Sequence, residues 1–380
     1  MTEARGKRAL KEDAQMAALE EKKILVINTG STSTKFSLFV GDEEVFKGDV
    51  DHDIDALKAC KSTDEQVALR KKTIDESLKE NNVDLSGLTA VAARGGTFGN
   101  VKGGAYTVND ELIYACKHPV IEHASCLSAL VGNDYAKEYG CEAYIYDAVC
   151  TDEVEDIARV TGIKGVERNV YSHTLNTRAV ARAVADKYGK EYKDLNFVVV
   201  HMGGGDSINV HQHGRIVDII SDDEGPMSPE RSGAISAINC AELCFSGEYP
   251  DYKSFMRKIH GNSGLVDFLG TKDMREIERR LEAGDEEAKK AIDAMVYQTA
   301  KAVASMAAVV DGKVDYIILT GGCMHRKWLA DATKAKVEWI APVEVIPGAY
   351  EMQALAKGIS RVLDGKEEAR EYKLSEDKTR

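Results

Sequence analysis

The sequence is poor in several features that mark whole classes of protein. Its 380 residues include only six prolines and two tryptophans, with no proline-rich or serine-rich linker and no short repeat. No stretch approaches the roughly 18 continuous apolar residues of a membrane span. Basic residues are in the minority: 50 Lys and Arg stand against 63 Asp and Glu, a net charge of −13. Such an acidic chain has no general attraction for polyanions, so we expect neither nucleic acid nor anionic membrane as a partner.

Metal-binding and disulfide patterns are also missing. The eight cysteines are scattered and form no CxxC pair, so neither a zinc site nor a disulfide framework is expected. Reduced thiols in a cytoplasmic protein are the economical interpretation. Residues 1–22 have no apolar core and mix acidic with basic side chains. We therefore expect a charged, solvated extension there rather than a secretory or transit peptide.

The composition is that of a globular α/β protein. Apolar residues make up 43% and charged residues 30%, and the length suits two domains. Short apolar or alternating runs bounded by turn residues predict strands, and apolar residues at helical spacing predict helices. The expected strands are 23–28, 35–40, 44–47, 90–93, 143–146, 197–201, 207–211, 215–220 and 316–322; the expected helices are 64–81, 291–310 and 352–363. The charged tail after Gly365 is interpreted as a solvated helix.

One pattern occurs twice. A strand, a small-residue turn and two further strands begin near residue 23 and again near residue 197, about 170 residues apart. The two segments share an order of elements rather than a sequence. This repeated order of elements predicts two halves with the same architecture.

Three apolar strands end in small-residue turns: Asn28–Ser33, His201–Gly205 and Thr320–Gly322. Such turns expose backbone N–H groups and allow a phosphate to approach closely. The run Gly30–Lys35 lacks the spacing of a Walker A loop, and the glycine triplet 203–205 leads into a strand rather than into the helix of a Rossmann fingerprint. The turns together predict a nucleotide held between two halves.

Charged residues accompany these turns. Arg94 and Asp147 each end a predicted strand, and Arg231 lies in the loop EGPMSPERSG. In α/β sheets, ligands bind at the carboxyl ends of strands. Arginine suits phosphate because its guanidinium is planar, always charged and bidentate. For a single arginine a structural ion pair is an equally good interpretation, but the set as a whole favours a ligand site.

These motifs together resemble a known family. LVINTGSTSTKF resembles the opening signature of the acetate and butyrate kinases, and HMGGG, ARGG, DDEGPMSPERSG and EMQALAKG are closer to its butyrate-kinase branch. The resemblance extends from about Lys23 to Tyr372, with the motifs in the family's order. It implies the sugar kinase, Hsp70 and actin fold: two ribonuclease-H-like domains, each with a five-stranded sheet, and a nucleotide cleft between them. The expected bounds are 23–171, completed by a helix at 352–372, and 172–351 for the nucleotide-binding domain.

The resemblance also implies an activity and a set of site residues. It implies reversible transfer of the ATP γ-phosphoryl group to a short-chain carboxylate, with acids of about four carbons favoured, in a homodimer or higher homo-oligomer. The implied catalytic residues are Arg94, Asp147, His173 and Arg231; the implied nucleotide-binding residues are Asn28, His201, Gly203, Gly204, Gly205, Asp273, Met274, Arg275, Gly321 and Gly322; and the implied magnesium-side residues are Asn28, Asp147 and Glu351.

The chemistry agrees with this assignment. A carboxylic acid is ionised at neutral pH and needs no general base, so Asp147 is better interpreted as a metal or water ligand. The obstacle is the approach of one anion to another, which magnesium, arginines and a histidine would offset. The alternatives are an acetate, propionate or branched-chain acid kinase, or a nucleotide-driven binding protein of the same fold that is not a kinase. Two residues depart from the family pattern: Asp206 follows the glycine triplet, and Ser172 replaces an aromatic residue beside His173.

Overall fold

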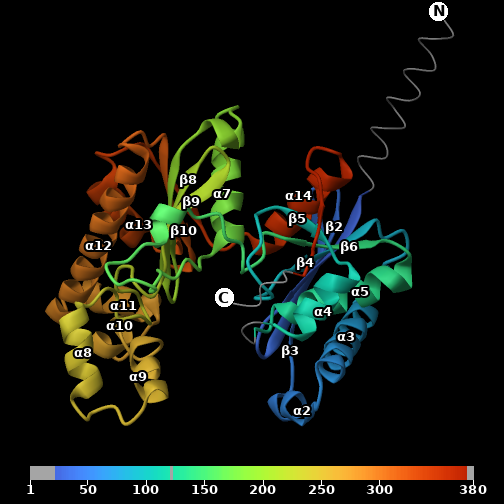
Figure 1. Cartoon of the computed structure of the whole chain (residues 1–380), viewed down its shortest axis with the longest axis horizontal. Helices are drawn as coiled ribbons and strands as arrows, with labels where there is room; N and C mark the ends of the chain where they lie inside the picture. Colours follow the sequence, from blue (N-terminus) through green and yellow to red (C-terminus); the bar gives the residue numbers. More distant parts are fainter. Residues whose placement is uncertain (1–21, 120–122, 375–380) are drawn as a thin grey trace, which may run out of the picture. The chain divides into compact units, whose positions relative to one another are not determined.

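The computed structural model describes residues 22–119 and 123–374 (Figure 1). The chain divides into two compact units. Unit 1 comprises the residues up to Thr151 together with those from Glu351 onward, and unit 2 comprises Asp152–Tyr350.

Unit 1 is built on a mixed sheet of seven strands in the order β12-β5-β6-β4-β1-β2-β3. The strands are β1 Lys23–Thr29, β2 Ser33–Val40, β3 Glu43–Asp51, β4 Ala90–Arg94, β5 Ala105–Thr107, β6 Glu142–Tyr146 and β12 Arg370–Glu371. β1, β4 and β6 run parallel, whereas β2 and β3 continue the sheet as antiparallel hairpins. The carboxyl ends of the three parallel strands therefore share one edge of the sheet.

Helices cover both faces of this sheet. They are α2 Ile54–Ala59, α3 Thr63–Glu80, α4 Asp110–Lys117, α5 Cys126–Tyr139 and α14 Glu351–Leu363. Ile145 on β6 belongs to the core that α3, α4 and α5 close. The next residue, Tyr146, accepts a 2.7 Å hydrogen bond from Arg361 of α14. Because neighbouring strand residues point to opposite faces, α5 and α14 lie on opposite sides of the sheet.

Unit 2 repeats the central part of this design. Its five strands are β7 Phe197–Met202, β8 Asp206–Gln212, β9 Arg215–Ile220, β10 Tyr316–Gly321 and β11 Val343–Pro347. Their order, β11-β10-β7-β8-β9, matches β6-β4-β1-β2-β3 of unit 1, with the same strand directions. The predicted repeat of two similarly built halves is confirmed. The sheet of unit 1 is larger than the five strands expected, because β5 and β12 extend its edge.

Helices also cover both faces of the second sheet. The helices of unit 2 are α6 Asp156–Arg159, α7 Thr174–Lys187, α8 Ala237–Phe245, α9 Tyr252–Ile259, α10 Leu265–Leu269, α11 Met274–Glu282, α12 Glu286–Ala307 and α13 Lys327–Val337, with 3₁₀ turns at Tyr192–Asp194, Ala308–Val310 and Gly322–His325. α7 packs on Val199 of β7, and α12 packs on the alternate residues Val198 and Val200. α12 begins earlier than residue 291 because the Asp285 side chain caps its first turn.

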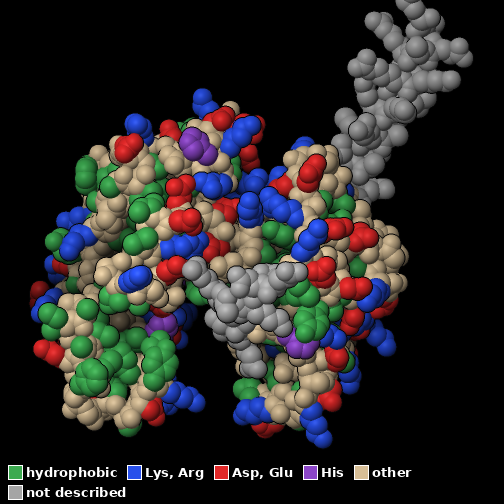
Figure 2. Space-filling model, viewed as in Figure 1, with side chains coloured by type: hydrophobic (Ala, Val, Ile, Leu, Met, Phe, Trp, Pro, Cys, Tyr) green, Lys and Arg blue, Asp and Glu red, His purple; other side chains and the backbone are tan. Residues whose placement is uncertain are grey.

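Helix α8 buries none of its residues. Ile238 and Phe245 of α8 are 70% and 90% exposed, and Tyr252 at the start of α9 is 78% exposed. Figure 2 shows hydrophobic side chains gathered on the surface over α8 and α9. We call the exposed side chains of Ile238, Phe245 and Tyr252 the α8 patch.

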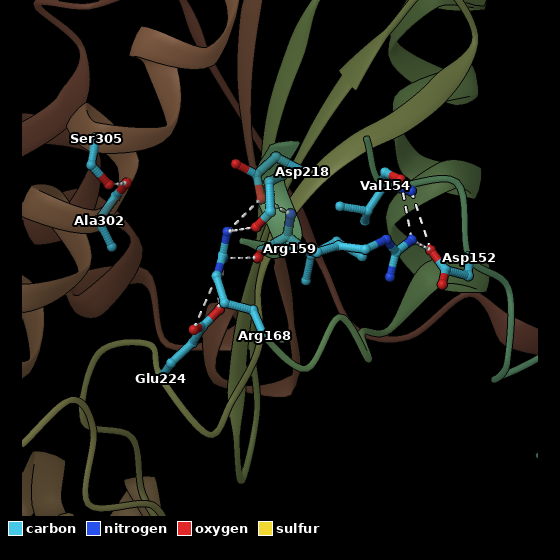
Figure 3. Close-up of polar contacts among 10 residues, drawn as sticks. Asp152, Val154, Arg159, Arg168, Asp218, Glu224, Ala302 and Ser305 are labelled. Atoms are coloured by element: carbon cyan, nitrogen blue, oxygen red, sulfur yellow. Dashed lines mark hydrogen bonds and ion pairs between the residues drawn. The ribbon is translucent and has the colours of Figure 1, made fainter. Parts of the chain in front are cut away.

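The segment 152–171 belongs to unit 2, so the division lies after Thr151 rather than after residue 171. Arg168 fastens it: its guanidinium lies 3.1 Å from Asp218 and 2.7 Å from Glu224 (Figure 3). Val154 and Val170 also pack with Ile216 and Ile219 of β9. These long-range contacts leave no signal in the local sequence.

The tail after Gly365 is not the solvated helix that its charge predicts. Within the described residues it contains β12, which pairs with β5, and Tyr372, which is buried edge-to-face against Phe98. One aromatic anchor therefore outweighs the charged residues around it. Residues 1–21, most of the predicted extension, lie outside the described residues. No helix in the described ranges is long and apolar enough to cross a membrane.

Candidate functional site

In unit 1 the predicted site residues meet at the carboxyl edge of the sheet. Asn28 lies near the end of β1, Arg94 ends β4, and Asp147 follows β6. Glu351, the first residue of α14, comes to this edge from the far end of the chain: its carboxylate accepts a 2.7 Å hydrogen bond from the Asn28 amide and lies 3.4 Å from the Arg94 guanidinium. The fold thus joins Asn28, Arg94 and Glu351 through direct contacts and places Asp147 at the same edge of the sheet.

Arg94 has a buried guanidinium with an unused hydrogen-bond donor. Its side chain is 8% exposed, and its Nη1 atom is buried without a hydrogen-bond partner among the described residues. A buried, unpaired guanidinium nitrogen is costly unless a ligand supplies an acceptor. His123 lies close enough for the positive charge of Arg94, after partial burial, to lower the pKa of its imidazole.

Asp147 is held in an unusual backbone conformation. Its φ angle is 43°, in the left-handed region that few non-glycine residues adopt, and its side chain is buried. Oδ1 accepts a 2.8 Å hydrogen bond from the Gly104 amide. Strain of this kind persists where a side chain must point in one direction, which agrees with a functional role.

In unit 2 the predicted phosphate-binding turn joins β7 to β8. Gly321, at the end of β10, lies beside it: its φ is 96°, and an added Cβ would lie 2.2 Å from the carbonyl oxygen of Met202. Only glycine fits there, so the second small-residue turn packs directly on the first. The adjacent Gly322 has open space where a Cβ would point.

Two histidines stack beside this turn. The rings of His173 and His201 are 3.8 Å apart and nearly parallel, at 4°. The Ser207 hydroxyl lies 2.9 Å from His173 Nδ1. Asn176 donates to Nδ1 of His201 at 2.9 Å, and its orientation is fixed because its Oδ1 accepts from the Tyr350 amide. Neutral His201 therefore carries its proton on Nε2.

Asp206, one of the two residues that depart from the family pattern, is fully buried at the start of β8. Its Oδ1 accepts a 3.1 Å hydrogen bond from the Gly203 amide, whereas Oδ2 has no partner among the described residues. Burial, and then repulsion from Asp222, raise the pKa of Asp206 well above its ordinary value. The raised pKa favours the neutral form of this carboxyl group, which is the form that conflicts least with a neighbouring phosphate.

Arg231 lies in the loop that follows β9. Its Nε donates a 3.0 Å hydrogen bond to Asp222, and its backbone forms a bridge with His260. The same loop is tied to segment 152–171 through the Arg168–Glu224 pair. Ser172 does not present a free surface beside His173, because its hydroxyl donates to Asn209 at 2.7 Å.

The segment 273–275 has a local structural role. Asp273 caps α11, and the Arg275 guanidinium lies 2.8 Å from its carboxylate, lowering the pKa of Asp273 to about 2. Met274 packs against the core of unit 2. None of these contacts points to a nucleotide base, so the nucleotide-binding role of these three residues stays a prediction. Among the described residues, no group of three or more His, Cys, Asp or Glu side chains is arranged to hold a metal ion.

Comparison with known proteins identifies the family. The profile of the Acetokinase family matches residues 156–328. Butyrate kinase 2 of Clostridium acetobutylicum is 43% identical over 354 residues, covering 92% of this chain and 99% of the relative. The chain belongs to the acetokinase family. A probable butyrate kinase of Clostridium botulinum is 41% identical over the same shares of both chains.

Solved acetokinase structures share the fold. The acetate kinase of Porphyromonas gingivalis superimposes with a TM-score of 0.72 at 20% identity, covering 89% of this chain and 99% of that one. The acetate kinase of Entamoeba histolytica gives 0.71 at 17% identity, over 89% and 98%. The predicted two-domain acetate kinase fold is confirmed.

Some residues of this acetokinase site are missing from the sequence-based prediction. Asn176 lies three residues after His173 on a helix that begins there, and that spacing was a usable signal. Asp222 and Glu230 lie in a loop already singled out, but nothing local indicates that their carboxylates reach the glycine turn. Those contacts join residues on different elements and follow only from the fold.

Proposed function

We propose that this acetokinase-family chain is a butyrate kinase, which transfers the γ-phosphoryl group of ATP reversibly to butyrate or a similar short acid. The observation that carries the proposal is the 43% identity to a butyrate kinase across nearly the full length of both chains. The geometry supports it, because unit 1 offers an anion site and unit 2 a glycine turn flanked by histidines and an arginine.

Arg94 binds the acid. Its buried guanidinium has an unsatisfied nitrogen, and a carboxylate is the ligand that pairs best with it. The acid is already ionised at neutral pH, so no side chain has to remove a proton. A carboxylate oxygen attacks the γ-phosphorus of ATP, the bond from phosphorus to the β–γ bridging oxygen breaks, and acyl phosphate and ADP result. No proton is gained or lost at the reacting atoms.

Arg231, His173 and His201 stabilise the transferring phosphoryl group. Its charge is spread over three equatorial oxygens in the transition state, and preorganised donors lower the barrier most there. The Ser207 contact fixes the ring of His173, and the Asn176 contact directs the Nε2 proton of His201 outward from the network. Each donor is thus set before the substrates bind.

Asn28, Asp147 and Glu351 are the residues that would hold magnesium. They provide carboxylate and amide oxygens, the hard donors that magnesium prefers, and a site with few protein ligands suits an ion that keeps most of its water. When bound, magnesium neutralises charge on the phosphates. Glu351 already draws Asn28 and Arg94 together, so ion and acid would be held by one connected set of side chains.

The chain also forms a homo-oligomer through the α8 patch. Large, exposed apolar side chains gathered on one surface mark an interaction site. α8 itself carries one acidic residue, Glu242, and no basic residue. A second copy of the chain fits this surface, because two copies with a net charge of −13 repel one another except through a nearly uncharged contact. Sedimentation velocity tests this assembly.

A direct assay tests the function. The chain is incubated with ATP, magnesium and acetate, propionate, butyrate or isobutyrate, and acyl phosphate is trapped as the hydroxamate. Butyrate or isobutyrate is expected to exceed acetate in kcat/KM by about tenfold, because each buried methylene contributes up to roughly 0.8 kcal/mol. If acetate is the best substrate, the chain is a carboxylate kinase but not a butyrate kinase. No acyl phosphate with any acid would reject the proposal.

A further inference from the structure

The carboxylate of Asp222 fills the space beside the glycine turn. A Cβ added to Gly205 would lie 2.5 Å from Asp222 Oδ2 and 3.0 Å from the Asp222 Cβ. The backbone of Gly205 does not require positive φ. Glycine is therefore needed at this position to make room for a side chain of the protein itself, whatever a phosphate requires.

The same oxygen holds Arg231. Asp222 Oδ2 accepts the hydrogen bond from Arg231 Nε at 3.0 Å. This contact uses the inner edge of the guanidinium. At the outer end, Nη1 makes one long contact of 3.4 Å to a backbone carbonyl, and Nη2 bonds to none of the described residues. The terminal nitrogens thus remain available to an anion.

Arg231 would otherwise have freedom to move. Its backbone is fixed by the bridge to His260 and by a hydrogen bond from the Ser228 amide, but its side chain is 24% exposed. Among the described residues, Asp222 is the only carboxylate that forms an ion pair with it. The ion pair with Asp222 therefore determines the direction in which the Arg231 side chain points.

We propose that Asp222 is a positioning residue for the phosphoryl-transfer reaction, which packs against Gly205 and aims the Arg231 guanidinium at the transferring group. The inference rests on the proposed function. Asp222 itself does not touch substrate. It binds Nε of Arg231 and leaves the two terminal nitrogens, Nη1 and Nη2, to bind phosphate oxygens. Displacement of such a group by about 1 Å can cost roughly a hundredfold in rate.

The test compares Asp222→Asn with Asp223→Asn. Asp223 is the adjacent acid and pairs with His260 instead, so it is a matched control. Asp222→Asn should lower kcat by about tenfold to a hundredfold without raising KM for ATP, whereas Asp223→Asn should stay within about twofold of wild type. A raised KM with unchanged kcat would show that Asp222 acts in nucleotide binding and would overturn the inference.

A double-mutant cycle separates positioning from a general structural role. In the Arg231→Ala background, Asp222→Asn should change kcat by less than about twofold, because the side chain that Asp222 positions has already been removed. Losses that multiply would contradict the inference. Gly205→Ala provides a second test, because the added Cβ would displace the Asp222 side chain. This variant should reproduce the kinetics of Asp222→Asn at an unchanged unfolding midpoint. A wild-type kcat in Gly205→Ala would also count against the inference. The wild-type protein is assayed for acyl-phosphate formation in parallel. If the wild type is inactive, the proposed function fails; if it is active, the variants test the role of Asp222 alone.

Discussion

The burial of Asp206 predicts how the stability of unit 2 depends on pH. Its side chain is fully buried, and the pKa of its carboxyl is raised well above 3.8 by burial and by repulsion from Asp222. Above the unfolded pKa the unfolded chain ionises this group, whereas the folded chain keeps its proton. The folded state then binds more protons than the unfolded state, so its stability falls as pH rises.

The magnitude follows from the linkage relation. Stability falls by about 1.4 kcal/mol for each pH unit over which folded Asp206 keeps its proton and the unfolded residue does not. The contribution is fully present below the unfolded pKa and is lost as pH rises to the folded pKa. Asp206→Asn removes this titration but keeps an oxygen for the Gly203 amide. The free energy of unfolding of the variant, relative to that of wild type, should therefore rise steadily between about pH 5 and the pKa of folded Asp206.

Urea unfolding followed by circular dichroism, at intervals from about pH 4 to pH 8, measures this difference. Only the slope of the difference matters, because any constant effect of the new amide group cancels. Asp293→Asn, a change at an exposed acid on α12, serves as the control. Parallel stability curves for wild type and Asp206→Asn would show that Asp206 ionises equally in both states and would refute the reasoning.

Three further outcomes follow from single contacts. Arg94→Ala should lower kcat/KM for the acid by about a hundredfold to a thousandfold while the far-UV spectrum stays native, and retention of a tenth of wild-type activity would contradict its role. Asn176→Ala should destabilise unit 2 by about 1–3 kcal/mol, because it leaves the buried Nδ1 of His201 without its donor; the unfolding midpoint measures the loss, and an unchanged midpoint would argue against that network. Phe245→Asp should reduce the sedimentation coefficient to that of a single chain without loss of secondary structure, and an unchanged coefficient would place the oligomer contact elsewhere.

The strand ends could be predicted from the sequence because their signals are local. Arg94 and Asp147 each close a short apolar run, and the turn after His201 is visible as three consecutive glycines. Residues at the ends of parallel strands share one edge of the sheet, so their association follows from strand order alone. The proximity of Glu351 to Asn28 came only from the family resemblance, because the two residues lie at opposite ends of the chain.

The contacts between elements could not be predicted in this way. The attachment of 152–171 depends on Arg168 reaching β9 and the loop after it, and the pairing of Asp222 with Arg231 depends on how one loop folds over a turn. The tail was predicted as a helix because charge dominates its composition, whereas the burial of Tyr372 decides its path. The composition of a charged segment does not indicate which one of its side chains becomes buried in the fold.

The central claim is that this acetokinase-family chain phosphorylates short carboxylic acids of about four carbons. The most direct measurement is acyl-phosphate formation from ATP, magnesium and butyrate, with acetate measured in parallel and ADP release followed in the same samples. The account predicts stoichiometric acyl phosphate and ADP, a higher kcat/KM for butyrate than for acetate by about tenfold, and loss of both products in Arg94→Ala. ADP release without acyl phosphate, or no dependence on the added acid, would contradict it.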